Sequence, residues 1–515
     1  MPSPTRTPGP VPPCAERLDL PPQRSSTARR DALVLGVLAT VVAGFLAWRP
    51  SAWYDEAATA LAVQAGWGDL GGMLREVDLV HALYYVLLRP WAAVVGVEPF
   101  ALRIPSAIGV GVAVAGTVLL GHRLGGRRLA LTAGIALLVL PRVTWAGTEA
   151  RSYAWALALA VLWTWAFLRA LDGRSSGRTA RRDWTLWGVL GALSIVCFLY
   201  TALLLPAQLV TLLLLRRRPG RAALVAAGAL GAFTLLFGAL VATQSAQVYW
   251  LPRIDAAIAR MVVADQFFLG AKLVGVLGWA VAGVGGVLGL LALRGRRPSA
   301  AHGPDEGATA TATVASVALP WLLVPLLVLV AVSVVEPRYY PRYLTFTAPA
   351  FALLLALALQ RLRAPVLVAA GVAAGVLLAP GYLAQRQVVA KEASDWALVV
   401  DHLRAVTRPG DVVLYGPLDV FPGDTRALGD SYPDAVADLS DPTRLPSRTG
   451  LWPDTAPLRA EDLSGTGTVW VVRAVGEPLD EDAADARTLR AAGFRETSDW
   501  AGPATTVERW TRTGG

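Results

Sequence analysis

The chain has 515 residues, of which 54% are hydrophobic and only 17% are charged, and its mean hydropathy is +0.48. Soluble domains carry about 25% charged residues, so this composition excludes an ordinary soluble protein and indicates an integral membrane protein. The net charge is +9, but the arginines lie in short loops between apolar runs and not along one face, which argues against nucleic-acid binding. The two cysteines predict neither a disulfide framework nor a thiolate metal site.

Residues 1–30 are rich in Pro, Ser, Thr and Arg without an apolar period, which predicts a disordered cytoplasmic tail. A membrane-spanning helix needs about 20 mostly apolar residues. Eleven runs meet or approach this length: 32–48, 102–121, 128–146, 152–170, 184–200, 201–215, 222–243, 273–293, 313–335, 343–360 and 365–383. The runs 184–200 and 201–215 could form one long tilted helix, but together they exceed an ordinary bilayer, so we expect two short spans.

One further run, 79–97, decides the topology. If it lies along the outer membrane interface, every arginine-rich loop falls on the side of the arginine-bearing N-terminal tail. If it spans, all these loops face outside, against the positive-inside rule. Tyr, Trp and Arg within the run also suit an interfacial helix. We therefore expect a cytoplasmic N-terminus in the plasma membrane, with 49–101, 147–151, 244–272, 336–342 and everything after 384 outside the cell.

The character of the chain changes after residue 385, where charge rises and the long apolar runs stop. The pattern predicts helices over 395–407 and 480–492, and strands over 411–415, 468–472 and 505–510. The predicted fold is a polytopic α-helical membrane domain over 31–385, with interfacial helices in its first outer loop. A small extracytoplasmic α/β domain over 386–515 follows it.

The first group of candidate site residues follows the first span. Asp55 and Glu56 are adjacent carboxylates, and a carboxylate at the membrane surface can act as general base toward a hydroxyl. Alternatively, Asp55 caps the next helix and Glu56 lies in its first turn. Asp78 and His81 are one turn apart if this region is helical, and with Asp55 they could form an acceptor site or a divalent-cation site. The alternative is a helix cap with one histidine.

Further charges lie at the outer ends of later spans. Arg103 follows Glu98, and it either pairs with that acid or serves phosphate binding or pairing behind the Asp55 loop. Glu149 and Arg151 precede Tyr153 at the start of a span. Charges at this depth are expensive unless they are paired or used, so they either pair with each other or bind the sugar or acceptor.

The segment 336–343 concentrates arginine and tyrosine between two spans. Arginine makes bidentate contacts with phosphate, so Arg338 and Arg342 are candidates for holding a leaving phosphate, with Tyr339 and Tyr343 beside them. The alternative is an aromatic belt with two snorkelling arginines. Lys272 at an outer helix end is either a second phosphate contact or a simple snorkelling lysine.

Four motifs in this order resemble the C superfamily (GT-C) of polytopic glycosyltransferases, which use polyprenyl-phosphate-linked sugars. They are Tyr-Asp-Glu-Ala at 54–57, His-Ala-Leu-Tyr-Tyr at 81–85, Leu-Arg-Ile-Pro-Ser-Ala at 102–107 and Glu-Ala-Arg-Ser-Tyr at 149–153. The superfamily includes lipid A aminoarabinose transferases, protein O-mannosyltransferases and proteins that resemble the rhizobial galacturonosyltransferases. The resemblance covers about residues 32–170 and the later arginine- and tyrosine-bearing loop. Many relatives have two prolines before the tyrosine pair, where this chain has Ala82 and Leu83.

The resemblance implies that Asp55 is the catalytic aspartate and that Tyr84 and Tyr85 lie on a helix along the membrane surface. It implies transfer of one sugar from a polyprenyl-phosphate donor to a hydroxyl of an envelope glycan, lipid or protein, with inversion at the anomeric carbon. No cofactor is implied with certainty, and a divalent cation is left open. The alternatives are a flippase or transporter for lipid-linked sugars, and a non-catalytic membrane scaffold.

Overall fold

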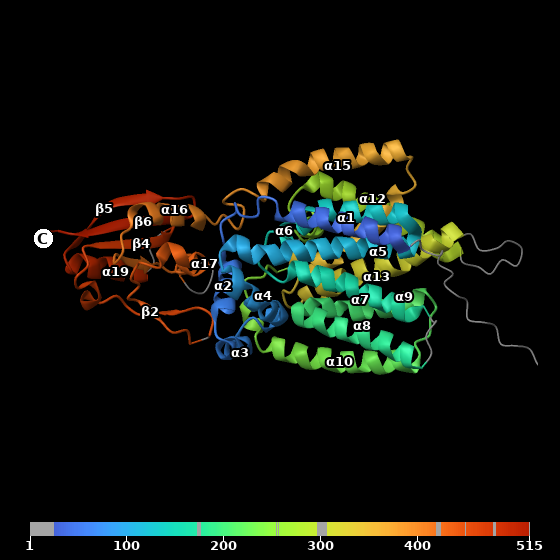
Figure 1. Ribbon diagram of the computed structural model, residues 1–515, viewed down its shortest axis with the longest axis horizontal. Helices are drawn as coiled ribbons and strands as arrows, with labels where there is room; N and C mark the ends of the chain where they lie inside the picture. Colours follow the sequence, from blue (N-terminus) through green and yellow to red (C-terminus); the bar gives the residue numbers. More distant parts are fainter. Residues whose placement is uncertain are drawn as a thin grey trace, which may run out of the picture.

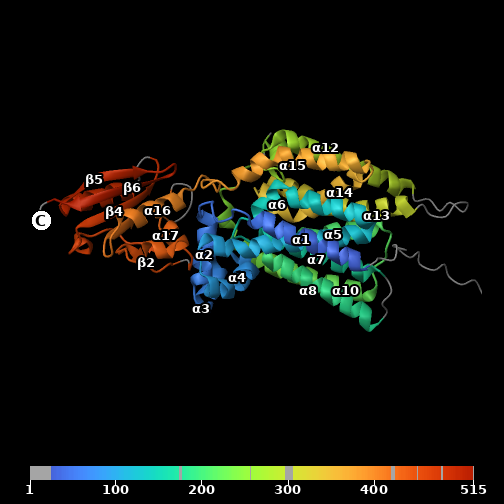
Figure 2. The same ribbon diagram turned by 45° about the horizontal axis from the view of Figure 1, so that its top comes forward.

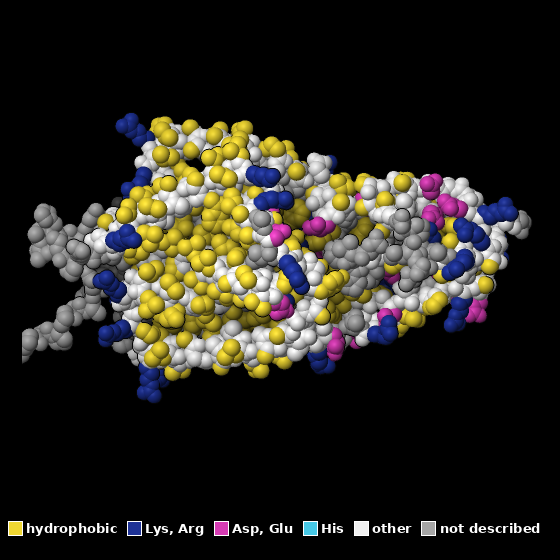
Figure 3. Space-filling model, turned by 180° about the vertical axis from the view of Figure 1, so that it is seen from behind, with side chains coloured by type: hydrophobic (Ala, Val, Ile, Leu, Met, Phe, Trp, Pro, Cys, Tyr) yellow, Lys and Arg dark blue, Asp and Glu magenta, His cyan; other side chains and the backbone are white. Residues whose placement is uncertain are grey.

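The computed structural model describes residues 25–172, 177–253, 255, 257–295, 306–418, 424–448, 450–476 and 480–513. A bundle of long helices carries a smaller, sheet-containing domain at one end, which we call the domain end (Figure 1). Arg side chains gather at the opposite, arginine-rich end, and hydrophobic side chains cover the body of the bundle between the two ends (Figure 3). This distribution is that of a multi-pass membrane protein.

The helices of the bundle coincide with the apolar runs of the sequence. They are α1 (Ser25–Gly44), α5 (Pro99–Val139), α7 (Tyr153–Leu171), α8 (Arg178–Cys197), α9 (Leu204–Leu214), α10 (Arg221–Ala242), α12 (Lys272–Gly295), α13 (Glu306–Ser333), α14 (Ala348–Leu359) and α15 (Ala364–Ala384). By length and composition, seven of the described helices could cross a membrane. The eleven predicted runs exceed this number because α1, α8 and α9 do not meet those criteria and α5 counts once. Helix α1 begins within the predicted tail, whose residues 1–24 lie outside the described ranges.

Two pairs of predicted spans form tight helical hairpins. Helix α5 contains both 102–121 and 128–146 up to Val139, and its two arms meet at Gly126, whose φ of +83° favours glycine. Helices α8 and α9 are separated at the extended residue Phe198. Trp187 on α8 donates a hydrogen bond of 2.7 Å to Gln208 on α9, so the chain folds back. The run 184–215 therefore contributes to two helices and not to one long tilted helix.

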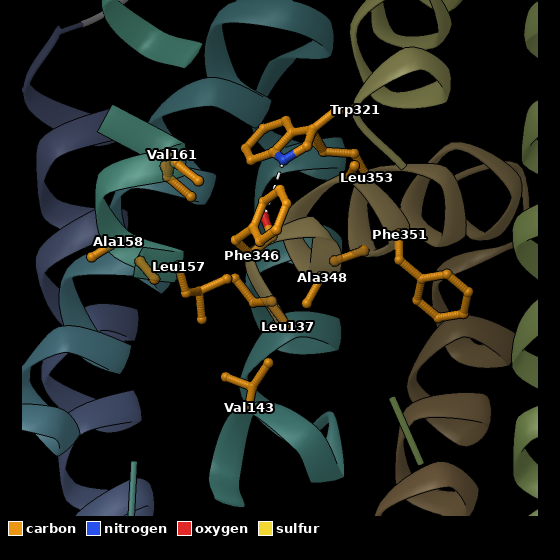
Figure 4. Close-up of a cluster of buried hydrophobic side chains, with 14 of the residues drawn as sticks. Leu137, Val143, Leu157, Ala158, Val161, Trp321, Phe346, Ala348, Phe351 and Leu353 are labelled. Carbon is orange, nitrogen blue, oxygen red and sulfur yellow. Dashed lines mark hydrogen bonds between the residues drawn. The ribbon is translucent and has the colours of Figure 1, made fainter. Parts of the chain in front are cut away.

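The core of the bundle consists of buried hydrophobic side chains packed around α5, α7, α13 and α14. Figure 4 shows Leu137, Leu157 and Phe351 in this core, with Trp321 donating a hydrogen bond of 3.0 Å to the backbone carbonyl of Phe346. Buried alanines and glycines let these helices approach one another closely. The core thereby fixes the helix ends from which the polar loops of the domain end emerge.

The first loop folds into short helices across the domain end (Figures 1 and 2). They are α2 (Tyr54–Gln64), α3 (Trp67–Glu76), the 3₁₀ turn η1 (Leu79–His81) and α4 (Ala82–Val95). At 14 residues, with Pro90 inside it, α4 is too short to span. The prediction that 79–97 is not a membrane span agrees with this geometry.

The C-terminal domain contains the predicted helices and strands, and in addition the short helices α17 and α18 and the strands β2, β3 and β5. Helix α16 (Trp396–Val406) precedes β1 (Val412–Tyr415), followed by α17 (Ala427–Ser431), α18 (Pro433–Val436), β2 (Arg444–Leu445), β3 (Asp454–Thr455), β4 (Thr468–Ala474), α19 (Asp480–Ala491), β5 (Phe494–Ala501) and β6 (Thr505–Arg512). The main sheet has the order β1-β4-β6-β5, with β1 and β4 parallel and the other pairs antiparallel. Sequence patterning missed β5 because only Phe494 in it is buried.

The domain docks directly on the first loop. The hydroxyl of Tyr432 accepts a hydrogen bond of 2.8 Å from the backbone N–H of Ala52. The ring of Trp452 stacks on Tyr54 with their centroids 4.5 Å apart. Tyr54 precedes Asp55, so the soluble domain lies beside the candidate site.

Candidate active site

Asp55 lies in the first turn of α2, where three distant segments of the chain meet. Its Oδ2 is 3.1 Å from Nη2 of Arg342 and 3.9 Å from Nε of Arg151. The contact with Arg342 has ion-pair distance without hydrogen-bond alignment, since Oδ2 has no hydrogen-bond partner. The helix is preceded by Trp53 and no side chain caps it, so the alternative of Asp55 as helix cap is wrong. A functional site requires such side chains to converge, whereas a non-catalytic scaffold does not.

Arg342 is buried in a cage of aromatic rings. It lies in the 3₁₀ turn η5 (Pro341–Thr347), between α13 and α14. Its guanidinium carbon is 5.2 to 5.8 Å from the centroids of four rings, those of Trp53, Tyr153, Trp250 and Tyr340. Such contacts hold a desolvated cation without neutralising it. Its Nε has no hydrogen-bond partner, so part of the guanidinium is free for a ligand.

Arg151 is held on the other side of Asp55. Its Nη1 donates to the Tyr85 hydroxyl at 2.6 Å and to Asp78 Oδ2 at 3.3 Å, and Tyr85 donates to the same Oδ2 at 2.6 Å. Burial raises the pKa of Tyr85, so the phenol stays protonated and can donate. Asp78 adopts the left-handed φ of +58°, and its N–H is held by Gln247 at 3.2 Å. A non-glycine residue in this region is strained and persists where its surroundings fix it.

His81 and Tyr84 form part of the buried wall beside this group. His81 Nδ1 lies 2.8 Å from the Ser152 hydroxyl, and burial lowers the histidine pKa well below its usual value. Tyr84 lies 3.4 Å from the Ser106 hydroxyl. Within the described ranges no three His, Cys, Asp or Glu side chains are arranged to hold a metal ion. Asp55, Asp78 and His81, for which a divalent-cation site was one alternative, do not form such a group there, and arginines face both acids.

Glu56 and Arg103 form a fully buried ion pair behind Asp55. Arg103 Nε donates to Glu56 Oε1 at 2.8 Å and its Nη2 to Oε2 at 2.5 Å. The remaining N–H groups donate to the carbonyls of Ala47, Pro50 and Ser51. All five guanidinium donors are thus used. The alternative pairing of Arg103 with Glu98 is wrong, because the Arg103 side chain extends from α5 toward Glu56 on α2 instead.

Glu149 does not pair with Arg151, in contrast to the alternative raised from sequence. Its side chain is fully buried, and neither carboxylate oxygen has a hydrogen-bond partner. Burial raises the pKa of this carboxyl. Near it lies Lys391, a buried residue that sequence reasoning missed, with Nζ 4.4 Å from the Trp145 ring centroid and without a hydrogen bond. Its scarcity was the available signal, since the chain contains two lysines only.

The remaining predicted residues separate into two groups. Tyr153 and Tyr343 stack with their centroids 6.4 Å apart beside Arg342 and belong to the site. Arg338 instead pairs with Glu336, and Tyr339 donates a hydrogen bond of 3.0 Å to Gln266. Lys272 is exposed at the first residue of α12. No contact in the described part of the chain joins Arg338 or Lys272 to Asp55.

A cavity of about 660 Å³ opens beside Arg342. Its charged lining also includes Arg142, Arg260, Asp265 and Glu392, and its apolar lining comes from α15 and from Met261, Phe268 and Leu269. Arg142 lies in α6 (Pro141–Ala146) and donates to the carbonyls of Asp265 and Gln266. Burial lowers its pKa to about 10, so it remains a cation near neutral pH. An arginine inside a predicted apolar run was the signal that sequence reasoning passed over.

Unsatisfied polar atoms concentrate around these residues. Buried side-chain polar atoms in proteins nearly always have a partner. Among the exceptions in the described ranges are Trp53 Nε1, Asp55 Oδ2, both Glu149 oxygens, Arg151 Nε, Arg342 Nε and Lys391 Nζ. These atoms include both donors and acceptors.

No protein-family model and no curated protein matches the chain. Several solved structures are similar to it. ArnT from Cupriavidus metallidurans in the apo state is 15% identical, with a TM-score of 0.57 over 94% of this chain and 98% of that one. ArnT bound to undecaprenyl phosphate is 14% identical, with a TM-score of 0.55 over 92% and 97%. The archaeal oligosaccharyltransferase AglB from Archaeoglobus fulgidus is 11% identical, with a TM-score of 0.48 over 94% and 74%.

The chain therefore has the GT-C fold of membrane glycosyltransferases. Among solved structures it is similar to ArnT over nearly the whole length of both chains. The resemblance drawn from the four sequence motifs is confirmed at the level of the fold.

Proposed function

We propose that the protein is a membrane glycosyltransferase that moves one sugar from a polyprenyl phosphate to a hydroxyl of an envelope acceptor. The observation that carries this proposal is the position of Asp55 between Arg342 and Arg151. Asp55 is a carboxylate that can accept a proton, and it contacts Arg342, which lines a cavity with an apolar wall. The GT-C fold and the undecaprenyl phosphate bound to ArnT support the choice of donor. We place the reaction at the outer face of the plasma membrane, following the arginine distribution.

The cavity beside Arg342 suits the lipid phosphate of the donor. Arg342 has an unpartnered Nε, and Arg142 adds a buried positive charge that no carboxylate in the structure directly neutralises. Arginine binds phosphate oxygens through parallel N–H donors, and such donors stabilise the charge that develops as a phosphate leaves. The apolar side chains of α15 offer the polyprenyl chain a path from the bilayer to these arginines.

In the proposed reaction, the acceptor oxygen forms a bond to the anomeric carbon while the bond from that carbon to the phosphate oxygen breaks. The acceptor proton passes to Asp55, and the electron pair of the broken bond leaves with the polyprenyl phosphate. Attack opposite the leaving group inverts the anomeric carbon. Asp78, Tyr85 and Arg151 position the acceptor side, and the Glu56–Arg103 pair holds the turn that presents Asp55.

The test is the substitution Asp55→Asn, which keeps the shape of the side chain and removes the base. Loss of a positioned base lowers a rate by about 10²–10⁴-fold. A deletion strain carrying the variant should lack the sugar that the wild-type gene restores to envelope glycans, as read by mass spectrometry. The matched control is Asp69→Asn, an exposed aspartate of the same loop, which should restore the sugar fully. A membrane-inserted Asp55→Asn protein with wild-type activity would contradict the proposal.

A further inference from the structure

The first turn of α2, which carries Asp55, is not held by a side-chain cap. Trp53 occupies the N-cap position with extended backbone, and its side chain makes no capping hydrogen bond in the described part of the chain. An uncapped helix end frays readily, because its first N–H groups lack partners within the helix. A base at such an end must be held by its neighbours, since a displacement of about 1 Å can slow a reaction by about 10²-fold.

The residues on both sides of Asp55 are each anchored by a different part of the protein. Glu56, which follows it, is fixed by Arg103 on α5. Tyr54, which precedes it, is the first residue of α2. The ring of Tyr54 stacks on Trp452, with the centroids 4.5 Å apart and an angle of 26° between the ring planes. Trp452 lies between β2 and β3, so one anchor of Asp55 comes from the helical bundle and the other from the C-terminal domain.

The two residues directly before Trp452 are fixed against the first loop. Leu451 is buried in the same hydrophobic cluster as Leu70 and Met73 on α3. Gly450 approaches the backbone of α3 so closely that a Cβ on it would lie 3.0 Å from the Met73 Cα, and its φ of +81° also favours glycine. The ring of Trp452 is therefore presented to α2 from a backbone that is itself held in place.

Other contacts of the C-terminal domain hold α2 independently of this stack. In the last turn of α2, Gln64 Nε2 donates to the backbone carbonyl of Asp430 at 3.3 Å. Before the helix, the N–H of Ala52 donates to the Tyr432 hydroxyl at 2.8 Å. Helix α17 packs against α2 between these points. Loss of the Trp452 ring should therefore leave the domain docked, while the first turn of α2 loses its aromatic neighbour.

We propose that Trp452 is a positioning residue for the base: its ring holds Tyr54, and thereby the first turn of α2, in the orientation that presents the Asp55 carboxylate to Arg342. Stacked aromatic rings prefer particular geometries, so the pair fixes an orientation as well as a distance. An aliphatic side chain would fill space without fixing that orientation. The C-terminal domain is then part of the catalytic unit. This inference rests on the proposed function and gives the domain its role in it.

The first test compares Trp452→Phe with Trp452→Leu in the deletion strain, at equal amounts of membrane-inserted protein. Phenylalanine keeps a ring that can stack on Tyr54, so this variant should restore at least about half of the sugar. Leucine keeps apolar bulk without a ring and should restore less than about one tenth, because a misplaced base is slow. The matched control is Trp500→Leu, the same change at a tryptophan that stacks on His402 in the same domain, which should restore the sugar fully. Equal restoration by the two Trp452 variants would overturn the inference.

The second test uses Leu451→Ala to separate position from stability. This change removes buried apolar contacts and should lower the unfolding temperature of the purified protein, but it leaves the Trp452 ring on Tyr54. It should therefore restore several times more sugar than Trp452→Leu. If the loss of sugar instead follows the loss of stability across Leu451→Ala, Trp452→Phe and Trp452→Leu, docking stability alone explains the effect and the inference fails.

Asp55→Asn in the same strain separates the two proposals. If Asp55→Asn is inactive while Trp452→Leu restores the sugar fully, only the role of Trp452 fails. If Asp55→Asn is active, or if the strain lacks no sugar, the proposed function fails.

Discussion

The substitution Arg103→Met tests how the first loop holds Asp55 in place. Arg103 has no exposed surface, and its five donors join Glu56 to the carbonyls of Ala47, Pro50 and Ser51. Methionine fills most of the volume but donates no hydrogen bond. The end of the loop after α1 and the start of α2 would then lose the group that ties them together.

The expected loss of stability follows from these contacts. Removing one partner of a buried ion pair costs about 3–5 kcal/mol, because the other charge stays buried without compensation. Each carbonyl left without a donor adds about 1 kcal/mol where water cannot replace it. We therefore expect Arg103→Met to destabilise the protein by at least about 4 kcal/mol. Glu56→Gln leaves an amide that can still accept from Arg103, so its cost should be about half as large.

The charge state of Glu56 gives the effect a pH dependence. Burial alone raises the pKa of Glu56, but Arg103, Lys391 and the Ala150 N–H together hold it below its usual value. A carboxyl with a lowered folded-state pKa stabilises the fold above its unfolded pKa of about 4.3, and this contribution is lost as the pH falls through the folded value. The wild-type protein should therefore lose stability in acid more steeply than Glu56→Gln.

Thermal unfolding of the purified variants in one detergent measures these differences. Glu98→Gln is the matched control, because Glu98 is only partly buried and does not contact Arg103. It should change stability by no more than about 0.5 kcal/mol. The double variant Glu56→Met and Arg103→Met should lose less stability than the sum of the losses of the two single variants, since the two groups interact. An Arg103→Met protein as stable as Glu98→Gln would refute the reasoning.

Two further predictions concern the junction with the C-terminal domain. Asp395→Ala removes the acceptor of the Ala504 and Thr505 N–H groups and of the Thr505 hydroxyl, so β6 should detach from the start of α16. The loss should be about 2–4 kcal/mol, and limited proteolysis should cleave the domain faster while the bundle stays intact. Burial lowers the pKa of Lys391 to about 8, so between pH 8 and 10.5 the unfolded chain binds a proton that the folded protein does not. Stability should therefore rise with pH in that window by at most about 3 kcal/mol, and Lys391→Met should flatten the unfolding temperature against pH.

The sequence was sufficient to predict the bundle and the end that carries the site. Apolar runs of membrane length and the asymmetric distribution of arginine can be recognised without knowledge of tertiary contacts. Because the helices alternate in direction, Asp55, Arg151 and Arg342 had to emerge at the same end. Their ion-pair distances are consistent with that reasoning.

The sequence alone did not predict which individual charges pair with one another. Arg103 is near Glu98 along the chain, but the direction of its side chain on α5 brings it to Glu56 instead. Arg338 and Arg342 are four residues apart, yet only Arg342 faces the site, because η5 begins between them. Such choices depend on side-chain direction, which loop composition does not encode.

The buried cations were the other feature that the sequence did not predict, because burial cannot be read from residue type alone. Lys391 lies between the last predicted span and the first predicted helix of the C-terminal domain, and Arg142 lies near the end of the predicted span 128–146. In the structure this segment folds against the Ser51 region and encloses Lys391. A sequence argument that placed every charge at a surface would therefore miss both buried cations.

The charges of the site are arranged so that cations exceed acids on the cavity side. Asp55 lies next to Arg342, Asp78 next to Arg151 and Glu56 next to Arg103. Glu149 and Lys391 are buried without hydrogen-bond partners, whereas Arg142 donates to two backbone carbonyls. Arg142 and Arg342 bring positive charge to the cavity that is lined by apolar side chains of α15, and Asp55 contacts the Arg342 guanidinium directly. In the proposed reaction, these cations stabilise the charge that develops on the departing phosphate.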